Sequence, residues 1–249
     1  MTRQNILITG ASAGLGAEMA RQFAALGRTL VLAARRTDRL AEVRQQLLRA
    51  NPGITVLVKA LDVTDHDAVF RVFAEAKAEL GTLDRVVVNA GLGKGQPLGT
   101  GYFHANKQTA ETNFVAALAQ CEAAMTAFRA QDAGHLVVVS SMSAMRGLPR
   151  TMSTYAASKA GIAALAEGVR ADTLRTPIKV TTLFPGYIRS EMNARARKTP
   201  LLVDTEPGVR AMVRAMEREV ATACVPAWPW TVVGYAMRFL PLRVVAKIA

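Results

Sequence analysis

The sequence is poor in cysteine and histidine, and it lacks any apolar run of the roughly 20 residues that a membrane-spanning helix needs. Its 249 residues include 2 cysteines and 3 histidines. Because Cys121 and Cys224 lie far apart among apolar neighbours, we expect buried thiols in a reducing compartment and no disulfide. The first residues show neither the apolar region of a signal peptide nor an Arg- and Ser-rich transit pattern. We therefore expect a cytoplasmic protein, and no metal site.

Acidic residues are also scarce relative to basic ones. There are 19 Asp and Glu against 31 Lys and Arg, which gives a formal net charge of +12. A basic field attracts nucleic acid, an anionic membrane or an anionic substrate. The arginines, however, are scattered over nearly every expected helix, with no basic stripe interleaved with aromatic residues. We interpret them as solvated helix faces and expect no nucleic-acid partner.

What the sequence does contain is an alternation of short apolar runs and helical patterns. The runs predict strands at residues 5–9, 29–34, 54–61, 83–88, 135–139 and 178–183. Each run is followed by a connection long enough for parallel pairing, and one long helix is expected over 107–131. The predicted fold class is α/β: a single domain over 1–249, with a doubly wound, Rossmann-type parallel sheet in a three-layer α/β/α arrangement. Polar candidates fall at the carboxyl ends of the strands, where such sheets bind ligands.

A glycine-rich turn joins the first strand to the first helix. Its glycines leave room for backbone amides at a helix N-terminus to approach a pyrophosphate. The residues of this turn that we expect to bind a dinucleotide are Gly10, Ser12, Ala13, Gly14, Leu15 and Gly16.

The same turn matches the G-x-S-x-G nucleophile elbow of serine hydrolases, with Ser12 as the nucleophile. An elbow needs earlier strands and an upstream oxyanion loop, yet only nine residues precede Gly10. The three histidines, His66, His104 and His135, also lie in ordinary helix, loop and strand contexts. The hydrolase is therefore the disfavoured alternative.

A cluster of guanidinium groups follows the second strand. In an NAD site an acidic residue at this point bonds the ribose 2′-hydroxyl. Here Arg35 and Arg36 follow the strand, and no carboxylate ends it. Planar guanidinium donors suit a phosphate, so we expect the 2′-phosphate of NADP(H), with NAD the less favoured cofactor. The alternative is a solvated turn in which Thr37 or Asp38 caps the next helix.

Tyr155 and Lys159 stand four residues apart in a run of helix formers, which places both side chains on one helix face. An ammonium about 4 Å from a phenolate stabilises it by roughly 4 kcal/mol at an effective dielectric constant of about 20. This is about three pKa units, enough to bring the pKa of Tyr155 from ~10 close to neutrality. The pair is predicted to perform acid–base chemistry, although the motif alone also fits a surface helix with a half-buried ring.

Small or polar residues also follow the third and fourth strands. Asp62 and Val63 follow the third, where Asp62 either bonds an adenine amine or only shapes a turn. Asn89, Ala90 and Gly91 follow the fourth, and small residues there let a flat cofactor lie against the strand end.

Taken together, these motifs resemble the short-chain dehydrogenase/reductase (SDR) family in its typical one-domain form. The matching elements, in the family's order over residues 9 to about 190, are Thr9-Gly10-x-x-x-Gly14-x-Gly16, Asp62-Val63, Asn89-Ala90-Gly91, Asn113, Ser141, Tyr155-x-x-x-Lys159 and Pro185-Gly186. The set is far more specific than any of its members. It implies an oxidoreductase that interconverts a carbonyl and an alcohol by hydride transfer.

The resemblance also implies a role for each catalytic residue. Tyr155 would be the general acid and base at the substrate oxygen, and Ser141 would hydrogen-bond the same oxygen. Lys159 would lower the pKa of Tyr155 and hold the nicotinamide ribose, while Asn113 would hold a water that links Lys159 to solvent. The further cofactor contacts that it implies are Asp62, Val63, Asn89, Ala90, Gly91, Pro185, Gly186, Ile188 and Ser190.

The spacing of one of these residues departs from the family pattern. Ser141 lies fourteen residues before Tyr155, one more than the pattern has. Ser140 and Ser143 therefore stay open as alternative donors, and Ser141 is preferred as the second serine of the pair that ends the strand.

The last third of the chain bears on substrate and partners. A basic lid over 187–205 and an apolar tail over 221–249 fit a small, apolar carbonyl or alcohol substrate of lipid, acyl or steroid type. For the tail there are two alternatives. It completes the sheet and packs on its own domain or across a homodimer or tetramer, or it rests on the inner membrane surface through Trp228, Trp230 and its basic residues. A non-catalytic dinucleotide sensor is an alternative that would not need the catalytic residues, and epimerases of the extended relatives carry a larger carboxyl-terminal domain.

Overall fold

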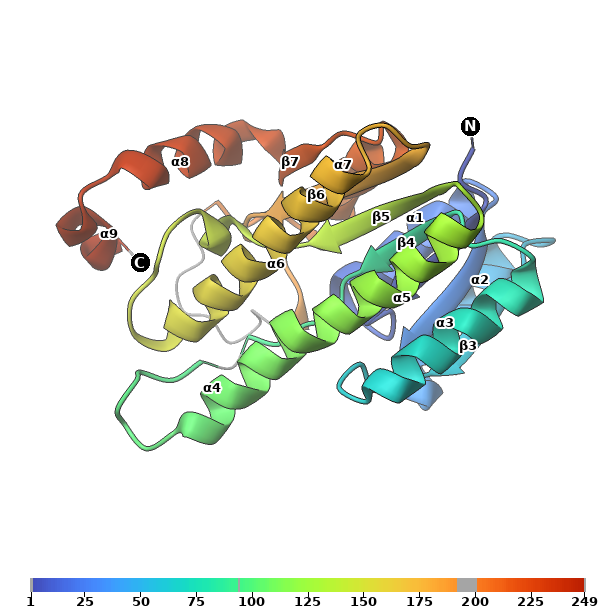
Figure 1. Ribbon diagram of the computed structural model, residues 1–249, viewed down its shortest axis with the longest axis horizontal. Coiled ribbons are helices and arrows are strands. Elements are labelled where there is room, and N and C mark those ends of the chain that lie inside the picture. The colour runs from blue at the N-terminus through green and yellow to red at the C-terminus, as the bar shows by residue number, and fades with distance from the viewer. Residues whose placement is uncertain (1, 94, 192–200, 249) are drawn as a thin grey trace.

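The computed structural model describes residues 2–93, 95–191 and 201–248, and its centre is a seven-stranded sheet (Figure 1). The strands are all parallel, in the order β3-β2-β1-β4-β5-β6-β7. They are β1 Asn5–Thr9, β2 Thr29–Ala34, β3 Val56–Ala60, β4 Arg85–Val88, β5 Gly134–Val139, β6 Ile178–Pro185 and β7 Thr222–Val225. The α-helices are α1 Gly14–Ala25, α2 Thr37–Ala50, α3 His66–Leu80, α4 Phe103–Ala110, α5 Ala116–Ala130, α6 Ser153–Asp172, α7 Thr205–Glu217, α8 Ala227–Phe239 and α9 Leu242–Ile248. Shorter helical turns are the π-helical η1 Glu111–Val115 and the 3₁₀ turns η2 Met142–Met145 and η3 Arg150–Met152.

The core occupies both faces of the sheet because side chains alternate along each strand. Leu7 of β1 belongs to the core formed with α3, α5 and α6. Its neighbours Ile6 and Ile8 belong to the core formed with α1, α2 and α7 on the opposite face. Because both faces of these parallel strands are covered, their sequences are nearly continuous apolar runs, and these runs are what predicted the strands. The predicted three-layer, doubly wound fold is confirmed.

The structure differs from the prediction in the long helix over 107–131. That segment begins earlier, at Phe103, and is interrupted by η1, where the amide of Ala116 bonds the carbonyl of Glu111. A single π-helical turn inserts one residue and rotates the helix that follows. No residue type specifies such a turn, so the sequence could not reveal it.

The strand boundaries also shift. β3 and β4 each begin two residues later than predicted, and β6 continues to Pro185. The seventh strand, β7, lies at the start of the tail and pairs with β6, so the alternative in which the tail completes the sheet is confirmed for Thr222–Val225. Its side chains are mostly exposed or half-buried, which is typical of an edge strand and gives no long apolar run.

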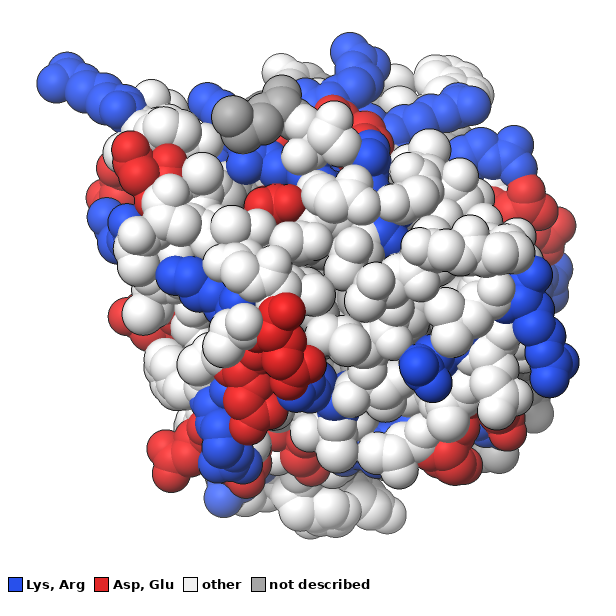
Figure 2. Space-filling model, turned by 90° about the vertical axis from the view of Figure 1, so that its right-hand side faces the viewer, with Lys and Arg blue, Asp and Glu red and all other residues white. Residues whose placement is uncertain are grey.

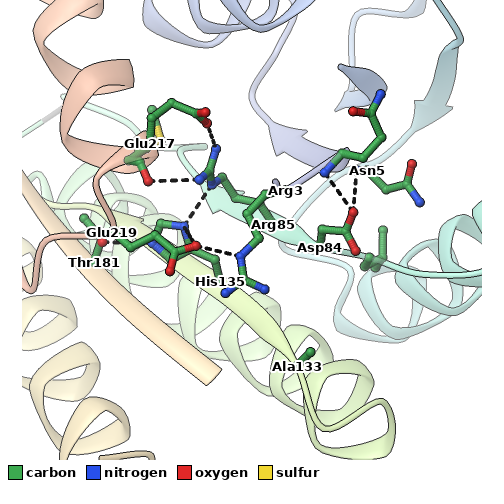
Figure 3. Close-up of polar contacts among 12 residues, drawn as sticks. Arg3, Asn5, Asp84, Arg85, Ala133, His135, Thr181, Glu217 and Glu219 are labelled. Carbon is green, nitrogen blue, oxygen red and sulfur yellow. Dashed lines mark hydrogen bonds and ion pairs between the residues drawn. The ribbon is translucent and has the colours of Figure 1, made fainter. Parts of the chain in front are cut away.

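A buried polar cluster ties the strands to α7 (Figure 3). Arg85 of β4 donates from Nε to Nδ1 of His135 on β5 (2.9 Å) and from Nη2 to the carbonyl of Met216 (2.9 Å), and it pairs with Glu217. Because Nδ1 of His135 accepts a hydrogen bond, the ring proton lies on Nε2, which donates to Oγ1 of Thr181 on β6 (2.8 Å). Burial, followed by the charge of Arg85, lowers the pKa of His135 well below its usual value, so the ring is neutral.

Figure 2 shows the side of the molecule that lies at the right of Figure 1. Lys and Arg side chains lie beside Asp and Glu around its rim, and its middle is largely uncharged. No single basic patch forms on this face. Across the described residues, no helix is both long and apolar enough to cross a membrane.

Candidate active site

The glycine turn after β1 is packed against the end of β4. A Cβ atom on Gly10, where φ is +65°, would lie 3.0 Å from Cα of Ala90, and one on Gly16 would lie 2.3 Å from the carbonyl oxygen of Gly10. Oγ1 of Thr9 accepts hydrogen bonds from the amides of Asn89 (3.1 Å) and Ala90 (3.2 Å). The two strand ends are thus held together, and a side chain has no room at Gly10 or Gly16.

Helix α1 begins in this turn at Gly14, and no side chain caps its first amides. Uncapped N–H groups at a helix N-terminus, with the positive end of the helix dipole, favour an anion. A turn with no room for a Cβ atom at Gly10 or Gly16, in front of such a terminus, fits the pyrophosphate of a dinucleotide, with Ser12 to Gly16 as the residues that would hold it.

The residues predicted to be catalytic converge at the carboxyl ends of β4 and β5. Half-buried Tyr155, on α6, shares a hydrogen bond with the side chain of Ser141, which directly precedes η2. Burial is the largest influence on Tyr155 and raises its pKa, the bond to Ser141 opposes this, and nearby Tyr187 adds to the rise. The phenol is therefore protonated at neutral pH.

The three candidate serines have different partners. Ser140 is buried, and its Oγ donates to the carbonyl of Lys159 (2.7 Å), so it braces α6 against β5. The amide of Ser143 donates to Oγ of Ser141 (3.1 Å) and orients it. Ser141 is the serine whose hydroxyl contacts the phenol of Tyr155.

Lys159 does not act on Tyr155 as the sequence predicted. Its Nζ donates to the carbonyl of Val139 (2.8 Å), and burial lowers its pKa to about 8. The pKa of Tyr155 is raised rather than lowered, because burial disfavours the phenolate and the ammonium is held by a strand-end carbonyl. The predicted shift toward neutrality is wrong for the protein in this state.

Asn113 is buried on the π-helical turn η1. Its Oδ1 accepts from the amide of Leu92 (2.7 Å), and its Nδ2 donates to the carbonyl of Leu92 (2.8 Å) and to Oγ of Ser158 (3.3 Å). A Cβ atom on Gly91 would lie 3.2 Å from Oδ1 of Asn113 and 3.5 Å from Nζ of Lys159, so the two groups converge on one glycine. Asn113 thus fixes the loop after β4 beside Lys159.

The guanidinium groups after β2 lie at the mouth of the glycine turn. Arg36 donates from Nε to Oγ of Ser12 (3.3 Å) and pairs with Glu191 (3.2 Å), while Arg35 pairs with Asp62 at 3.7 Å. Asp62 also accepts bonds from the amide and the hydroxyl of Thr64. Burial raises its pKa, but these bonds and the charge of Arg35 outweigh it and lower the pKa overall. Asp62 thus shapes the turn after β3, and its contact with an adenine amine stays a prediction.

The residues after β6 extend from Trp230 of α8 to the glycine turn. Gly186 packs so closely on Trp230 of α8 that a Cβ atom there would lie 2.1 Å from Cε2 of the indole. Ile188 is buried, and a Cβ atom on Gly208 of α7 would lie 2.8 Å from its Cγ2, so its side chain packs into the core. Cβ of Ser190 lies 3.5 Å from the position of a Cβ atom on Gly14, which places it at the glycine turn. The middle of the predicted lid over 187–205, residues 192–200, lies outside the described residues.

The comparison with known proteins decides the family. The family model for short chain dehydrogenases matches residues 4–201. The chain belongs to the short-chain dehydrogenase family. Its members are oxidoreductases that use a nicotinamide dinucleotide, so the resemblance inferred from the motifs is confirmed.

Relatives of this SDR protein include uncharacterized oxidoreductases from two bacteria. One from Mycobacterium tuberculosis is 53% identical over 249 residues, covering 100% of this chain and 98% of the relative. One from Myxococcus xanthus is 34% identical over 242 residues, covering 97% and 94%. Among solved structures, a short-chain type dehydrogenase/reductase from Mycobacterium marinum has a TM-score of 0.79 at 27% identity, covering 86% and 88% of the two chains. Levodione reductase has a TM-score of 0.80 at 23% identity, covering 90% and 95%, and this likeness shows the fold alone.

The sequence missed several residues of this SDR site. Arg21 and Arg39 line a hollow of about 220 Å³ with Ser12, Gly14 and Glu191, at the mouth of the glycine turn. Tyr187 lies near Tyr155 and meets Trp230 edge to face, with ring centroids 5.7 Å apart. Arg39 lies four residues after Arg35, in the first turn of α2, and this third nearby arginine could have been noticed. The contact of Trp230 with Gly186 joins residues 44 positions apart and left no signal in the sequence.

Proposed function

We propose that this protein is an NADP(H)-dependent oxidoreductase that interconverts a ketone or aldehyde and the corresponding alcohol, with Tyr155 as the general acid and base. The observation that carries the proposal is the contact of Tyr155 with Ser141 beside buried Lys159, next to a turn that fits a pyrophosphate. The nicotinamide supplies the hydride in the direction of reduction and accepts it in the direction of oxidation.

The protonation states suit reduction. The raised pKa of Tyr155 keeps its hydroxyl protonated, so in reduction the phenol donates that proton to the carbonyl oxygen as negative charge develops there. Ser141 stabilises the same oxygen through its hydroxyl. With a pKa of about 8, Lys159 is mostly charged at pH 7. Its ammonium, held beside the site by the carbonyl of Val139, would hold the nicotinamide ribose.

Arg35 and Arg36 support a preference for NADP(H). Their present partners, Asp62 and Glu191, are largely exposed carboxylates, and exposed ion pairs are weak. A 2′-phosphate offers more acceptor oxygens and more charge than either carboxylate, so it is the better partner for two guanidinium groups. No carboxylate ends β2, where an NAD-binding protein would bond the ribose 2′-hydroxyl.

The remaining parts of the proposal concern the substrate, the domain organisation, the location and the oligomeric state. The aromatic pair of exposed Tyr187 and buried Trp230, together with the apolar tail, supports an apolar substrate of lipid, acyl or steroid type. We also propose one functional domain over 1–249 with 187–205 as its lid, a cytoplasmic location, and a homodimer or tetramer.

A substrate screen with a matched variant tests the function. Ketosteroids, 3-ketoacyl thioesters and medium-chain aldehydes are each mixed with NADPH, and its absorbance is followed. Tyr155→Phe should lower kcat at least a hundredfold on any good substrate, while NADPH affinity stays within a few-fold. Tyr102→Phe, on the exposed loop before α4, is the control and should change neither.

Two outcomes would contradict the proposal. If Tyr155→Phe kept most of its turnover, the acid–base role would be wrong. If NADPH bound tightly but no carbonyl compound consumed it, the non-catalytic sensor would replace the enzyme.

A further inference from the structure

The segment after β7 is fastened to the body of the protein by one face only. Two residues of α8 pack on the rest of the protein. Trp230 is 5% exposed and contacts Gly186, and a Cβ atom on Gly234 would lie 2.6 Å from Cε of Met142. Arg146, after η2, donates to the carbonyls of Arg238 (3.2 Å) and Leu240 (3.4 Å). These anchors lie directly beside Ser141 and Gly186. In Figure 1 the segment, in red, extends beyond the edge of the sheet.

The outer face of the same segment is apolar and uncovered. Five large apolar side chains line it. Val232, Tyr235 and Phe239 share one face of α8 at intervals of three and four residues, Trp228 lies at a non-helical position at the start of α8, and Leu242 begins α9. Their exposed fractions are 76% for Trp228, 56% for Val232, 70% for Tyr235, 71% for Phe239 and 63% for Leu242. The rings of Tyr235 and Phe239 are 5.1 Å apart. We call these five side chains the apolar stripe, and an exposed apolar surface of this kind marks a place that meets a partner.

The charge of the segment indicates the partner. Residues 220–249 contain no Asp or Glu, while Arg238, Arg243 and Lys247 are all exposed. The stripe thus combines aromatic and aliphatic side chains with cations of one sign only. Helices of 13 and 7 residues are too short to span a bilayer. A segment that lies in the membrane interface has this composition, because its aromatic side chains sit at the level of the headgroups and its cations face anionic lipid.

We propose that α8 and α9 dock this protein on an anionic lipid bilayer, with the apolar stripe in the interface and the active site held beside it. The docking depends on the stripe and its cations alone, so it does not rest on the proposed function. Removing outer residues leaves the anchors at Trp230 and Gly234 in place, which allows the surface to be tested without disturbing the fold.

Sedimentation with lipid vesicles tests the proposal. The purified full chain is mixed with vesicles of phosphatidylcholine alone or with about one-third phosphatidylglycerol, and the pelleted fraction is measured. We expect pelleting with the anionic vesicles only, and release at about 1 M salt, where the screening length falls to about 3 Å. Arg243→Ala with Lys247→Ala should weaken binding about 10- to 30-fold, since each cation near an anionic surface contributes roughly 1 kcal/mol.

The apolar stripe needs its own variant and control. Trp228→Ser with Phe239→Ser should abolish pelleting, whereas Leu174→Ser, which removes a side chain 75% exposed outside this segment, should leave it unchanged. Circular dichroism melting of each variant checks that the fold is kept. Absence of pelleting by the unaltered protein would overturn the proposal. A second result would also overturn it: no vesicle binding, together with an oligomer that dissociates in the variant Trp228→Ser with Phe239→Ser. The stripe would then be a contact between copies of this chain.

Discussion

Arg85→Met should destabilise the protein by about 3 kcal/mol, because the guanidinium is the hub of the buried cluster in Figure 3. The side chain is 1% exposed, and its removal leaves Nδ1 of His135 and the carbonyl of Met216 without donors. Each buried polar group left unpaired costs about 1–3 kcal/mol, and breaking a buried ion pair costs about 3–5 kcal/mol. Glu217 keeps Arg28 as a partner at 2.8 Å, so the lower end applies.

The assay is urea unfolding followed by circular dichroism, with thermal melting as a second measure. A loss of about 3 kcal/mol corresponds to a fall in Tm of roughly 6–12 °C for a protein of this size. Arg210→Met removes an equally long side chain from the exposed pair with Glu206 on α7, and it should cost less than about 0.5 kcal/mol. If Arg85→Met cost less than about 1 kcal/mol, the cluster would not hold α7 to the sheet as described.

Three further predictions concern pH, the glycine turn and the cofactor. The pKa of His135 is lower in the folded protein than in the unfolded chain, so its contribution to stability is complete above about pH 6.5 and is lost as the pH falls below it. Between pH 7.5 and 5.5, His135→Gln should therefore lose less stability than the unaltered protein, and equal losses in urea titrations would contradict this. Gly16→Ala should weaken NADPH binding at least tenfold in a fluorescence titration, since its Cβ would lie 2.3 Å from the carbonyl of Gly10, whereas Gly168→Ala, with open space around it, should not change binding. NADPH should bind at least ten times more tightly than NADH, and Arg35→Asp should invert the preference; equal affinities would remove the support for this assignment.

Burial explains which parts of the fold were predictable. The bounds of β1 and β2 agree with the prediction because both strands are buried apolar runs that end in clear turns. β7 is mostly exposed or half-buried and lies within an apolar tail, so nothing distinguished its four residues from their neighbours. The π-helical turn at Asn113 follows from tertiary packing, because helix propensity does not separate it from an ordinary turn.

The site was predictable in its residue types but not in its contacts. The order of the motifs identified Tyr155, Ser141 and Lys159, and the structure brings them together. The direction of the Lys159 ammonium depends on the carbonyl of Val139, twenty residues away on β5, and no local spacing encodes it. The pairing of Arg36 with Glu191 joins residues 155 positions apart and could only be found in three dimensions.

The most direct test of the central claim follows the hydride itself. NADPH carrying deuterium at both C4 positions of the nicotinamide is incubated with the protein and its best carbonyl substrate, and the alcohol is analysed by mass spectrometry. We predict one deuterium per product molecule, on the carbon that bore the carbonyl oxygen, and at least a hundredfold slower transfer with Tyr155→Phe. Product without deuterium at that carbon, or transfer at an undiminished rate with Tyr155→Phe, would contradict the account.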